Sequence, residues 1–301
     1  MTNPAGYSYT PLPARPAGRW PNGARLAVVV YVGVESYRFG DGHTEDVLAD
    51  VPAPDLVNTA WRDYGNRVGA FRMFEALRGL GIPPTVLLNT DVYDEAPAVL
   101  EAARRAGAEI VGHGRSNSDS LSQMNSEAER AYLTDVADGI RAQEGSAPGG
   151  WSSPWLSHTP ATVGLLAETG YRYLLDLRLD DQPVWLSTEA GPLLAIPYAA
   201  ELNDSSTMIG RSVSARDFAD MIDDEFGELH TAAAQTPLVM SVVLHSFISG
   251  VPFRLSAVRR ALARVAATDD VWLTTPREIH RAVVDSPELF GTPDAVAEVT
   301  S

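Results

Sequence analysis

Short runs of branched aliphatic residues alternate along the chain with longer segments in which apolar side chains recur every three or four positions. The first run, residues 25–32, is almost wholly apolar, which is typical of a strand buried on both faces. Comparable runs predict further strands, and the periodic segments predict helices. The predicted strands after the first are 85–88, 109–111, 171–175, 193–196, 238–244 and 271–273, and the predicted helices are 68–80, 96–106, 126–143, 160–168, 214–230, 255–265 and one beginning at 275.

Alternating strands and helices of this length favour parallel pairing, so the pattern predicts an α/β fold with a closed or nearly closed (β/α) barrel. Residues 1–24 form a Pro-rich arm, residues 25–285 the barrel as a single domain, and residues 286–301 a C-terminal tail. The stretch 33–63 is rich in Gly, Asp and Pro and has no sustained period, so it is predicted to be a long loop. Long ordered loops in compact domains tend to be functional.

Composition narrows the chemistry. The chain has no cysteine, which removes disulfides, thiolate metal sites and cysteine nucleophiles, so a metal would need His, Asp, Glu or Asn ligands. The net charge of −16 disfavours nucleic acid and anionic membrane surfaces as partners. The sequence shows neither a signal-peptide core nor a membrane-spanning run, so a cytoplasmic protein acting on a small molecule is expected.

Polar and aromatic side chains follow the predicted strands, where the residues that do chemistry in such barrels are found. Taken singly, a Glu, His or Asn at a strand end more often caps a helix or forms hydrogen bonds with the backbone of a loop. Several at successive strand ends make a stronger signal. The strand-end residues that we select are Glu35, His113, Asn117, Ser153, Trp155, Tyr198, Asn203 and His245.

Desolvation at the end of a buried strand would raise the pKa of Glu35 toward that of a usable acid or base, although a loop-capping carboxylate is the alternative. His113 is flanked by glycines, which allow close approach of backbone or ligand. Arg67, in the segment 64–69 with Tyr64, could present its planar guanidinium to a substrate, or it could form an ion pair on an acidic surface. Trp155 and Tyr198 could line a small pocket or belong to the core.

The order of these motifs resembles the polysaccharide deacetylase (NodB-homology) superfamily. A strand-end acid is followed by Gly-His-Gly, a Ser-Pro turn, Asp-Asp-Xaa-Pro, Ile-Pro-Tyr with Asn-Asp, and Leu-His with Gly-Xaa-Pro-Xaa-Arg. The resemblance covers residues 25–283 and is greatest to the allantoinase-like branch, whose members open cyclic ureides. It implies the distorted (β/α) barrel of the NodB type, and it gives His245 the role of proton donor. Relatives that assemble as tetramers imply a homo-oligomer, a dimer or tetramer.

The chain also departs from the family pattern. The resemblance implies that metal-dependent members carry an acidic pair after the first strand and His-Xaa-Xaa-Xaa-His after the third. This chain has Gly33 and Glu35 in the first motif, and His113 and Asn117 in the second. The family's Arg-Xaa-Pro turn has Ser152 in place of arginine. Zinc remains possible through Glu35, His113 and Asn117, but an amide is a poor zinc ligand. No cofactor is therefore favoured.

Together these features predict a hydrolase that cleaves a non-peptide C–N bond in a cyclic amide, imide or ureide. Glu35, His113 and His245 would be catalytic, with water activated by Glu35 or His113. Substrate would be bound by Tyr64, Arg67, Asn117, Ser153, Trp155, Tyr198 and Asn203. Two alternatives stay open: a zinc-dependent N-deacetylase of an amino sugar or another N-acetylated metabolite, and a catalytically inactive homologue that binds a ligand.

Overall fold

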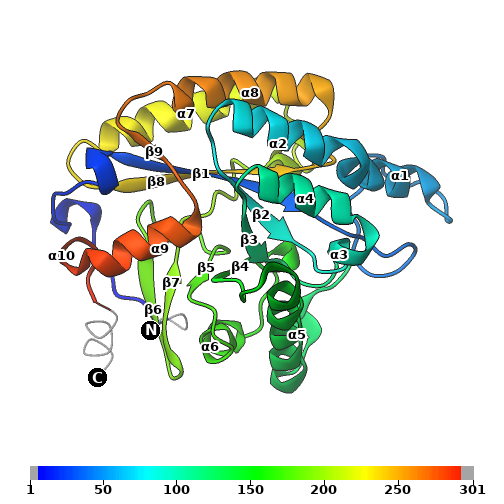
Figure 1. The fold of residues 1–301 in the computed structure, drawn as a ribbon, viewed down its shortest axis with the longest axis horizontal. Coiled ribbons are helices and arrows are strands. Elements are labelled where there is room, and N and C mark those ends of the chain that lie inside the picture. Colours follow the sequence, from blue (N-terminus) through cyan, green and yellow to red (C-terminus); the bar gives the residue numbers. More distant parts are fainter. Residues whose placement is uncertain (1–5, 293–301) are drawn as a thin grey trace.

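A computed structural model describes residues 6–292 of the chain and shows a single curled sheet flanked by helices (Figure 1). The strands pair in the order β6-β7-β5-β4-β3-β2-β1-β8, and β9 pairs with β1. All pairs are parallel except the antiparallel hairpin of β6 and β7. The strands are β1 Leu26–Val34, β2 Pro84–Leu88, β3 Glu109–Gly112, β4 Gly150–Trp151, β5 Tyr173–Leu174, β6 Val184–Thr188, β7 Gly191–Ala195, β8 Leu238–His245 and β9 Val271–Leu273.

Irregular segments, rather than a strand pair, bring the two ends of this sheet together. The backbone N–H of Val243 in β8 donates to the carbonyl of Leu202, and that of Val239 donates to Asp181, both at 2.8 Å. Leu202 and Asp181 belong to the segments that follow β7 and precede β6. The result is the distorted, incompletely closed barrel that the sequence predicts.

The burial of β1 explains its continuous apolar sequence. All nine residues of β1 are buried. Alternate side chains lie in two different cores: Val28, Val30 and Val32 pack with the surrounding helices, whereas Val29 and Tyr31 lie in the second core with residues of the other strands. A strand covered on both faces needs apolar residues at every position.

Helices α2, α4, α7 and α8 lie over the outer face of β1, β2 and β8, and α5 and α6 lie beside the strands that follow (Figure 1). The two longest strands, β1 and β8, therefore run through the middle of the molecule. The helices are α1 Leu56–Tyr64, α2 Ala70–Gly79, α3 Val92–Glu95, α4 Pro97–Arg105, α5 Ser126–Glu144, α6 Thr162–Glu168, α7 Ala215–Ala232, α8 Pro252–Ala266, α9 Pro276–Asp285 and α10 Pro287–Phe290.

The loop predicted over residues 33–63 is shorter in the structure, because β1 continues to Val34 and α1 begins at Leu56. Asp55 caps α1 by accepting from the backbone N–H of Asn58 at 2.9 Å. A π turn, Gly65–Gly69, then joins α1 to α2. The sequence hides α1 because Leu56 is exposed while Asn58 and Arg62 are buried, which reverses the usual periodicity.

Two strands were not predicted. Strand β4 has only two residues, which is too short for any period, and β6 forms the outer member of the antiparallel hairpin. In β6 only Trp185 and Leu186 are buried, so its pattern is weak.

The arm and the last helices cover the end of the barrel where the strands begin. Trp20 is buried and its indole N–H donates to the carbonyl of Leu238 at the start of β8, at 2.7 Å. Arg15 forms an ion pair with Asp180 before β6. Helix α10 lies within the predicted tail, and residues 293–301 of that tail are outside the described part.

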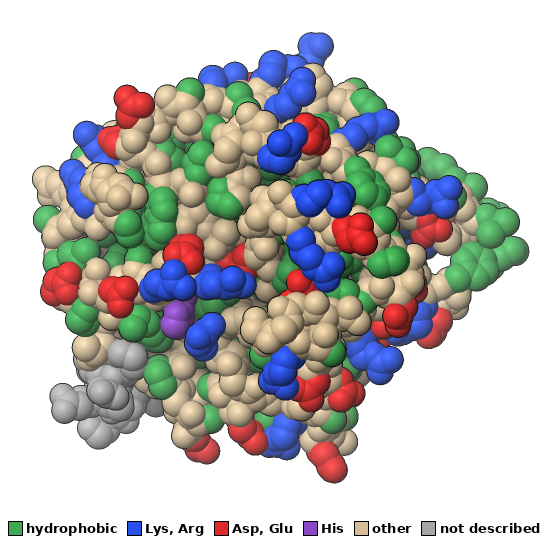
Figure 2. Space-filling view, viewed as in Figure 1, with side chains coloured by type: hydrophobic (Ala, Val, Ile, Leu, Met, Phe, Trp, Pro, Cys, Tyr) green, Lys and Arg blue, Asp and Glu red, His purple; other side chains and the backbone are tan. Residues whose placement is uncertain are grey.

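On the surface, acidic and arginine side chains are interspersed over one face, and hydrophobic side chains gather on a projection at its right edge (Figure 2). Leu48, Leu56 and Val57, around the start of α1, are among the exposed large hydrophobic residues. Across residues 6–292, no helix has both the length and the apolar character needed to cross a membrane.

Candidate active site

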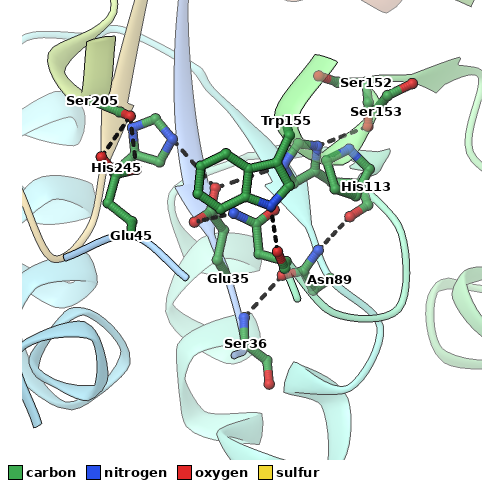
Figure 3. Close-up of polar contacts among 12 residues, drawn as sticks. Glu35, Ser36, Glu45, Asn89, His113, Ser152, Ser153, Trp155, Ser205 and His245 are labelled. Carbon is green, nitrogen blue, oxygen red and sulfur yellow. Dashed lines mark hydrogen bonds and ion pairs between the residues drawn. The ribbon is translucent and has the colours of Figure 1, made fainter. Parts of the chain in front are cut away.

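Strand register places the three predicted catalytic residues at one edge of the sheet. Gly33 of β1 is level with His245 of β8, and Val34 is level with Leu88 of β2, which is in turn level with Gly112 of β3. The side chains of Glu35, His113 and His245 consequently meet at the carboxyl edge of the strands (Figure 3). The structure thus brings the predicted trio together.

The two oxygens of the Glu35 carboxylate have different surroundings. Oε1 lies 3.6 Å from Nε2 of His113 and 3.3 Å from Nε2 of His245. Oε2 accepts the hydroxyl of Tyr37 at 2.6 Å and the amide N–H of Asn117 at 3.1 Å. The side chain is 1% exposed, so one oxygen is held by fixed donors while the other faces two titratable rings.

His245 is held by a second carboxylate. Asp204 lies 2.6 Å from Nδ1 of His245 and also accepts the backbone N–H of that residue. Burial opposes the charged ring, but Glu35 and Asp204 together raise the pKa of His245 well above its usual value. His245 is therefore an imidazolium at neutral pH, with its Nε2–H directed at the Glu35 side.

His113 has a different hydrogen-bond partner. Its Nδ1 lies 2.7 Å from the backbone carbonyl of Ser152. Because a carbonyl oxygen can only accept, Nδ1 must carry the proton, and Nε2 of the neutral ring is then an acceptor. The side-chain amide of Asn89 donates to the carbonyl of His113 and fixes the backbone at this point. Beside the Glu35 carboxylate, Nε2 of His113 is thus a proton acceptor and Nε2 of His245 is a proton donor.

Burial by itself would raise the pKa of Glu35, but the nearby imidazolium of His245 reverses this effect and holds the pKa well below its usual range. Glu35 and His245 therefore form a carboxylate–imidazolium pair. A carboxylate with a strongly lowered pKa is a weak base. Tyr37, whose pKa is raised by burial and by Glu35, remains a neutral donor to that carboxylate.

Gly33 is required by this packing. A Cβ at Gly33 would lie 2.9 Å from Cδ2 of His245 and 3.0 Å from Oε1 of Glu35. The Glu35 carboxylate thus occupies the space beside Gly33, where the family pattern implies an acidic side chain.

The implied metal ligands do not fit a metal ion. Gly33 offers no donor atom, and Asn117 directs its amide nitrogen, not its oxygen, toward Glu35 and Tyr37. The amide orientation follows from chemistry, since a carboxylate only accepts. Within residues 6–292, no group of three or more His, Cys, Asp or Glu side chains is placed to hold a metal ion.

Trp155 lies over the site (Figure 3). Its indole N–H donates to the carbonyl of Asn117 at 2.6 Å. The Trp155 side chain is partly exposed to solvent, and its backbone φ of 59° is in the left-handed region. Such backbone strain in a non-glycine residue is often found at functional sites. Ser153 positions this turn, because its backbone N–H donates to both oxygens of Asp176 at 2.9 Å.

The other side of the site is formed by the segment that follows β7. Tyr198 is buried against Tyr31, with ring centroids 5.3 Å apart. The amide oxygen of Asn203 accepts the backbone N–H of Ser205 at 2.9 Å. Both predicted residues therefore shape this wall, and neither forms a hydrogen bond with Glu35.

Tyr64 and Arg67 are not brought into this cluster. Tyr64 accepts a hydrogen bond from Arg72, and Arg67 is exposed in the π turn. The turn contributes through its other residues: Asn66 donates to the backbone carbonyl of Glu35 at 2.7 Å, and a Cβ at Gly69 would clash with the carbonyl of Ser246 at 1.9 Å. Substrate binding by Tyr64 and Arg67 stays a prediction.

Sequence reasoning did not select Tyr37, Asp204 or Asn66. Asp204 stands beside the predicted Asn203, so the Asn-Asp motif carried a signal, but an ordinary turn explains that motif equally well. Two buried polar atoms, Oδ1 of Asn117 and Oγ of Ser152, have no hydrogen-bond partner among the described residues. Six further buried side-chain atoms of residues 6–292 also lack a partner, so these two atoms do not by themselves mark the site.

Comparison with known proteins agrees with this architecture. Residues 62–174 match the polysaccharide deacetylase family model. A Schizosaccharomyces pombe protein named as a polysaccharide deacetylase is 23% identical over 296 residues, which cover 87% of this chain and 91% of the relative. A probable polysaccharide deacetylase from Pseudomonas aeruginosa PAO1 has a TM-score of 0.82 and 24% identity, over 90% of this chain and 94% of that one.

The crystal structure of PuuE allantoinase is also similar, with a TM-score of 0.84 and 24% identity over 94% of this chain and 97% of that one. At this identity the structural likeness establishes the fold. Together with the matched segment 62–174, it confirms the resemblance to the polysaccharide deacetylase (NodB) family that the motifs predict.

Proposed function

We propose that this protein hydrolyses a non-peptide C–N bond in a small cyclic amide or ureide without a metal ion. The observation that carries the proposal is the pair of histidines whose Nε2 atoms lie 3.6 Å and 3.3 Å from the same oxygen of Glu35. One ring is held as an acceptor by Ser152 and the other as a donor by Asp204. A base and an acid therefore face one space, as hydrolysis requires.

His113 takes the proton of the attacking water through its free Nε2. Glu35, a weak base because of its low pKa, stabilises the imidazolium that forms at His113. His245 donates its Nε2 proton to the nitrogen that leaves as the C–N bond breaks. General acid and general base each contribute ~10²–10⁴-fold in typical enzymes.

Two observations support a reaction independent of metal. Asn117 directs its amide nitrogen, rather than its oxygen, toward Glu35, and the His245 imidazolium lies 3.3 Å from Oε1 of Glu35. The His245 imidazolium thus already supplies a positive charge beside this carboxylate oxygen. Two positive charges this close to one carboxylate oxygen would repel each other.

The burial of the three side chains supports a small substrate. Glu35, His113 and His245 are all buried beneath Trp155 and the segment that follows β1. The name of the structurally similar PuuE allantoinase agrees with a cyclic ureide. We therefore place cyclic ureides ahead of N-acetylated sugars.

The test is turnover of a substrate panel followed by mass spectrometry. Allantoin, hydantoin and N-acetylglucosamine would be incubated with the protein, and products would be examined for addition of water or for released acetate. We expect water addition to a cyclic ureide, with kcat/KM reduced at least a hundredfold in both His113→Asn and His245→Asn. His230→Gln, whose ring lies 2.6 Å from Asp270 outside the site, is the matched control.

Full activity in either active-site variant would remove that histidine from the mechanism. Release of acetate, together with no ureide turnover, would replace the proposal with the deacetylase alternative.

A further inference from the structure

The segment that follows Glu35 crosses the site, and we refer to residues 37–48 as the mouth strap. On one side it is attached to the loop after β3, where the backbone N–H of His43 donates to the carbonyl of Ser118 at 3.0 Å. The backbone N–H of Arg38 also donates to the hydroxyl of Ser118, at 2.9 Å. These bonds hold the strap against the loop that carries Asn117.

On the other side the mouth strap is attached through Glu45. The hydroxyl of Ser205 donates to the carboxylate of Glu45, with its oxygen 2.7 Å and 2.9 Å from the two carboxylate oxygens. Ser205 directly follows Asp204, the residue that holds His245. Arg62 fixes the strap from below by donating to the carbonyl of Glu45 at 2.8 Å and to Asp46 at 2.6 Å.

These bonds place the Glu45 carboxyl beside the catalytic histidine, as Figure 3 shows for Glu45, Ser205 and His245. Burial raises the pKa of Glu45, the His245 charge and the Ser205 hydroxyl lower it, and Glu35 adds to the increase. The carboxyl therefore shares the electrostatic field of the site. No arginine among residues 6–292 forms an ion pair with it, because Arg62 binds the Glu45 backbone and the carboxylate of Asp46.

The charges around the site are consequently unbalanced. Three acidic side chains, Glu35, Glu45 and Asp204, surround the single imidazolium of His245. The chain contains no lysine, and the buried Arg62 is paired with Asp46. Arg254, which interacts with the charge of Asp204, adds one further positive charge, so the three acids still outnumber the cations. A carboxylate entering this space meets net negative charge, whereas an uncharged molecule does not.

We propose that Glu45, held in the mouth strap by Ser205, determines specificity by restricting the site to uncharged small amides and ureides and rejecting their carboxylate analogues. The inference rests on the proposed function, because it concerns the same site. A negative charge within several ångströms of Glu45, at an effective dielectric constant near 20, would be disfavoured by about tenfold to a hundredfold in binding.

The test compares two nearly isosteric probes, hydantoin-5-acetamide and hydantoin-5-acetate, by calorimetric titration at pH 8 and by turnover. We expect the wild type to bind the acetamide at least tenfold more tightly. Glu45→Gln keeps an acceptor for the Ser205 hydroxyl but removes the charge, so acetate binding should improve about fivefold or more while acetamide binding stays within twofold. Asp41→Asn removes one charge from an outward position of the same strap, 74% exposed, and should change neither.

Ser205→Ala separates the charge from the attachment. It keeps the Glu45 charge, so the preference for the acetamide should persist even if both probes bind more weakly. Equal binding of the two probes by the wild type, binding of neither, or an unchanged preference in Glu45→Gln would overturn the proposal. Discrimination in binding without turnover of any ureide would instead leave it standing and contradict the proposed hydrolase.

Discussion

Two buried glutamates at opposite ends of the barrel show how the same side chain serves two purposes. Glu109 begins β3 and Glu35 follows β1, and both are almost completely buried. Glu109 accepts the hydroxyl of Tyr173 on one oxygen and the backbone N–H of Arg277 on the other, at 2.9 Å for the latter. The Arg277 guanidinium also lies 3.8 Å from Oε1 of Glu109. None of these three partners titrates near neutral pH.

Glu35 has fixed donors on only one of its oxygens, and its other oxygen faces two histidines. A buried carboxylate surrounded by fixed donors stabilises structure, whereas one facing groups that gain and lose protons can take part in a reaction. The difference lies in the partners, since burial is the same. We therefore expect the barrel to have a structural end and a reactive end, and the following variants test that division.

Replacement by glutamine should lower the catalytic rate at Glu35 and the stability of the fold at Glu109. Glu35→Gln removes the charge that stabilises an imidazolium at His113, so we expect kcat/KM to fall by about 10²–10³-fold. Glu109→Gln leaves one of the two donors without a charged acceptor and should lower the free energy of unfolding by about 1–3 kcal/mol with kcat unchanged. Steady-state kinetics and urea unfolding of both variants make the comparison.

The division fails if Glu109→Gln reduces kcat as much as Glu35→Gln does, once both proteins are shown to be folded by circular dichroism.

Gly33→Ala sharpens the comparison without removing any polar group. The new Cβ would lie 2.9 Å from His245 and 3.0 Å from the Glu35 carboxylate, so both must move. Shifts of this size commonly reduce catalysis by about ten- to a hundredfold. Gly79→Ala is the control, because no atom lies within 4 Å of its Cβ position in α2 and alanine favours the helix. Kinetics on both variants would show whether the tight contact matters.

Much of the reactive end was predictable because it depends on strand ends. Glu35, His113 and His245 each follow a run of apolar residues, and parallel strands necessarily bring their carboxyl ends to one edge. Asn66 and Glu45 were missed because their positions depend on how α1 and the mouth strap fold over that edge. No local period encodes such contacts, and α1 itself has exposed Leu56 where a buried residue would be expected.

At the structural end the sequence predicts the strands and helices but not the buried hydrogen bonds of Glu109. Glu109 is a charged residue at the start of a strand, where solvent exposure is the ordinary expectation. Its burial follows from Tyr173, 64 positions later in the chain, and from α9, which lies against this end. Arg67 is the opposite case: its chemistry suits a ligand and it lies exposed in the π turn, and its role in substrate binding stays a prediction.

The pH profile of Asp204→Asn tests how the reactive end is charged. Glu35 and Asp204 raise the pKa of His245, so the wild type keeps the donor proton as pH rises past about 6.5, the ordinary value for histidine. Activity should therefore decline only at a clearly higher pH. Removing the Asp204 charge lowers the pKa of His245, and the alkaline limb of kcat/KM should move to lower pH by about one pH unit. An unchanged limb would show that another group sets it.

The smallest expected effect is that of chelation, and it follows from the donors that Glu35 faces. A metal ion would need lone pairs from neighbouring side chains, but Asn117 presents its N–H₂ group and Tyr37 its O–H to one oxygen of Glu35. The other oxygen already faces the His245 imidazolium at 3.3 Å. Protein dialysed against EDTA should keep kcat/KM within about twofold, with metal content measured in parallel by mass spectrometry. Stoichiometric zinc whose removal abolishes turnover would mean that these side chains rearrange on binding it, and the reactive end would then owe its charge to a cation rather than to His245.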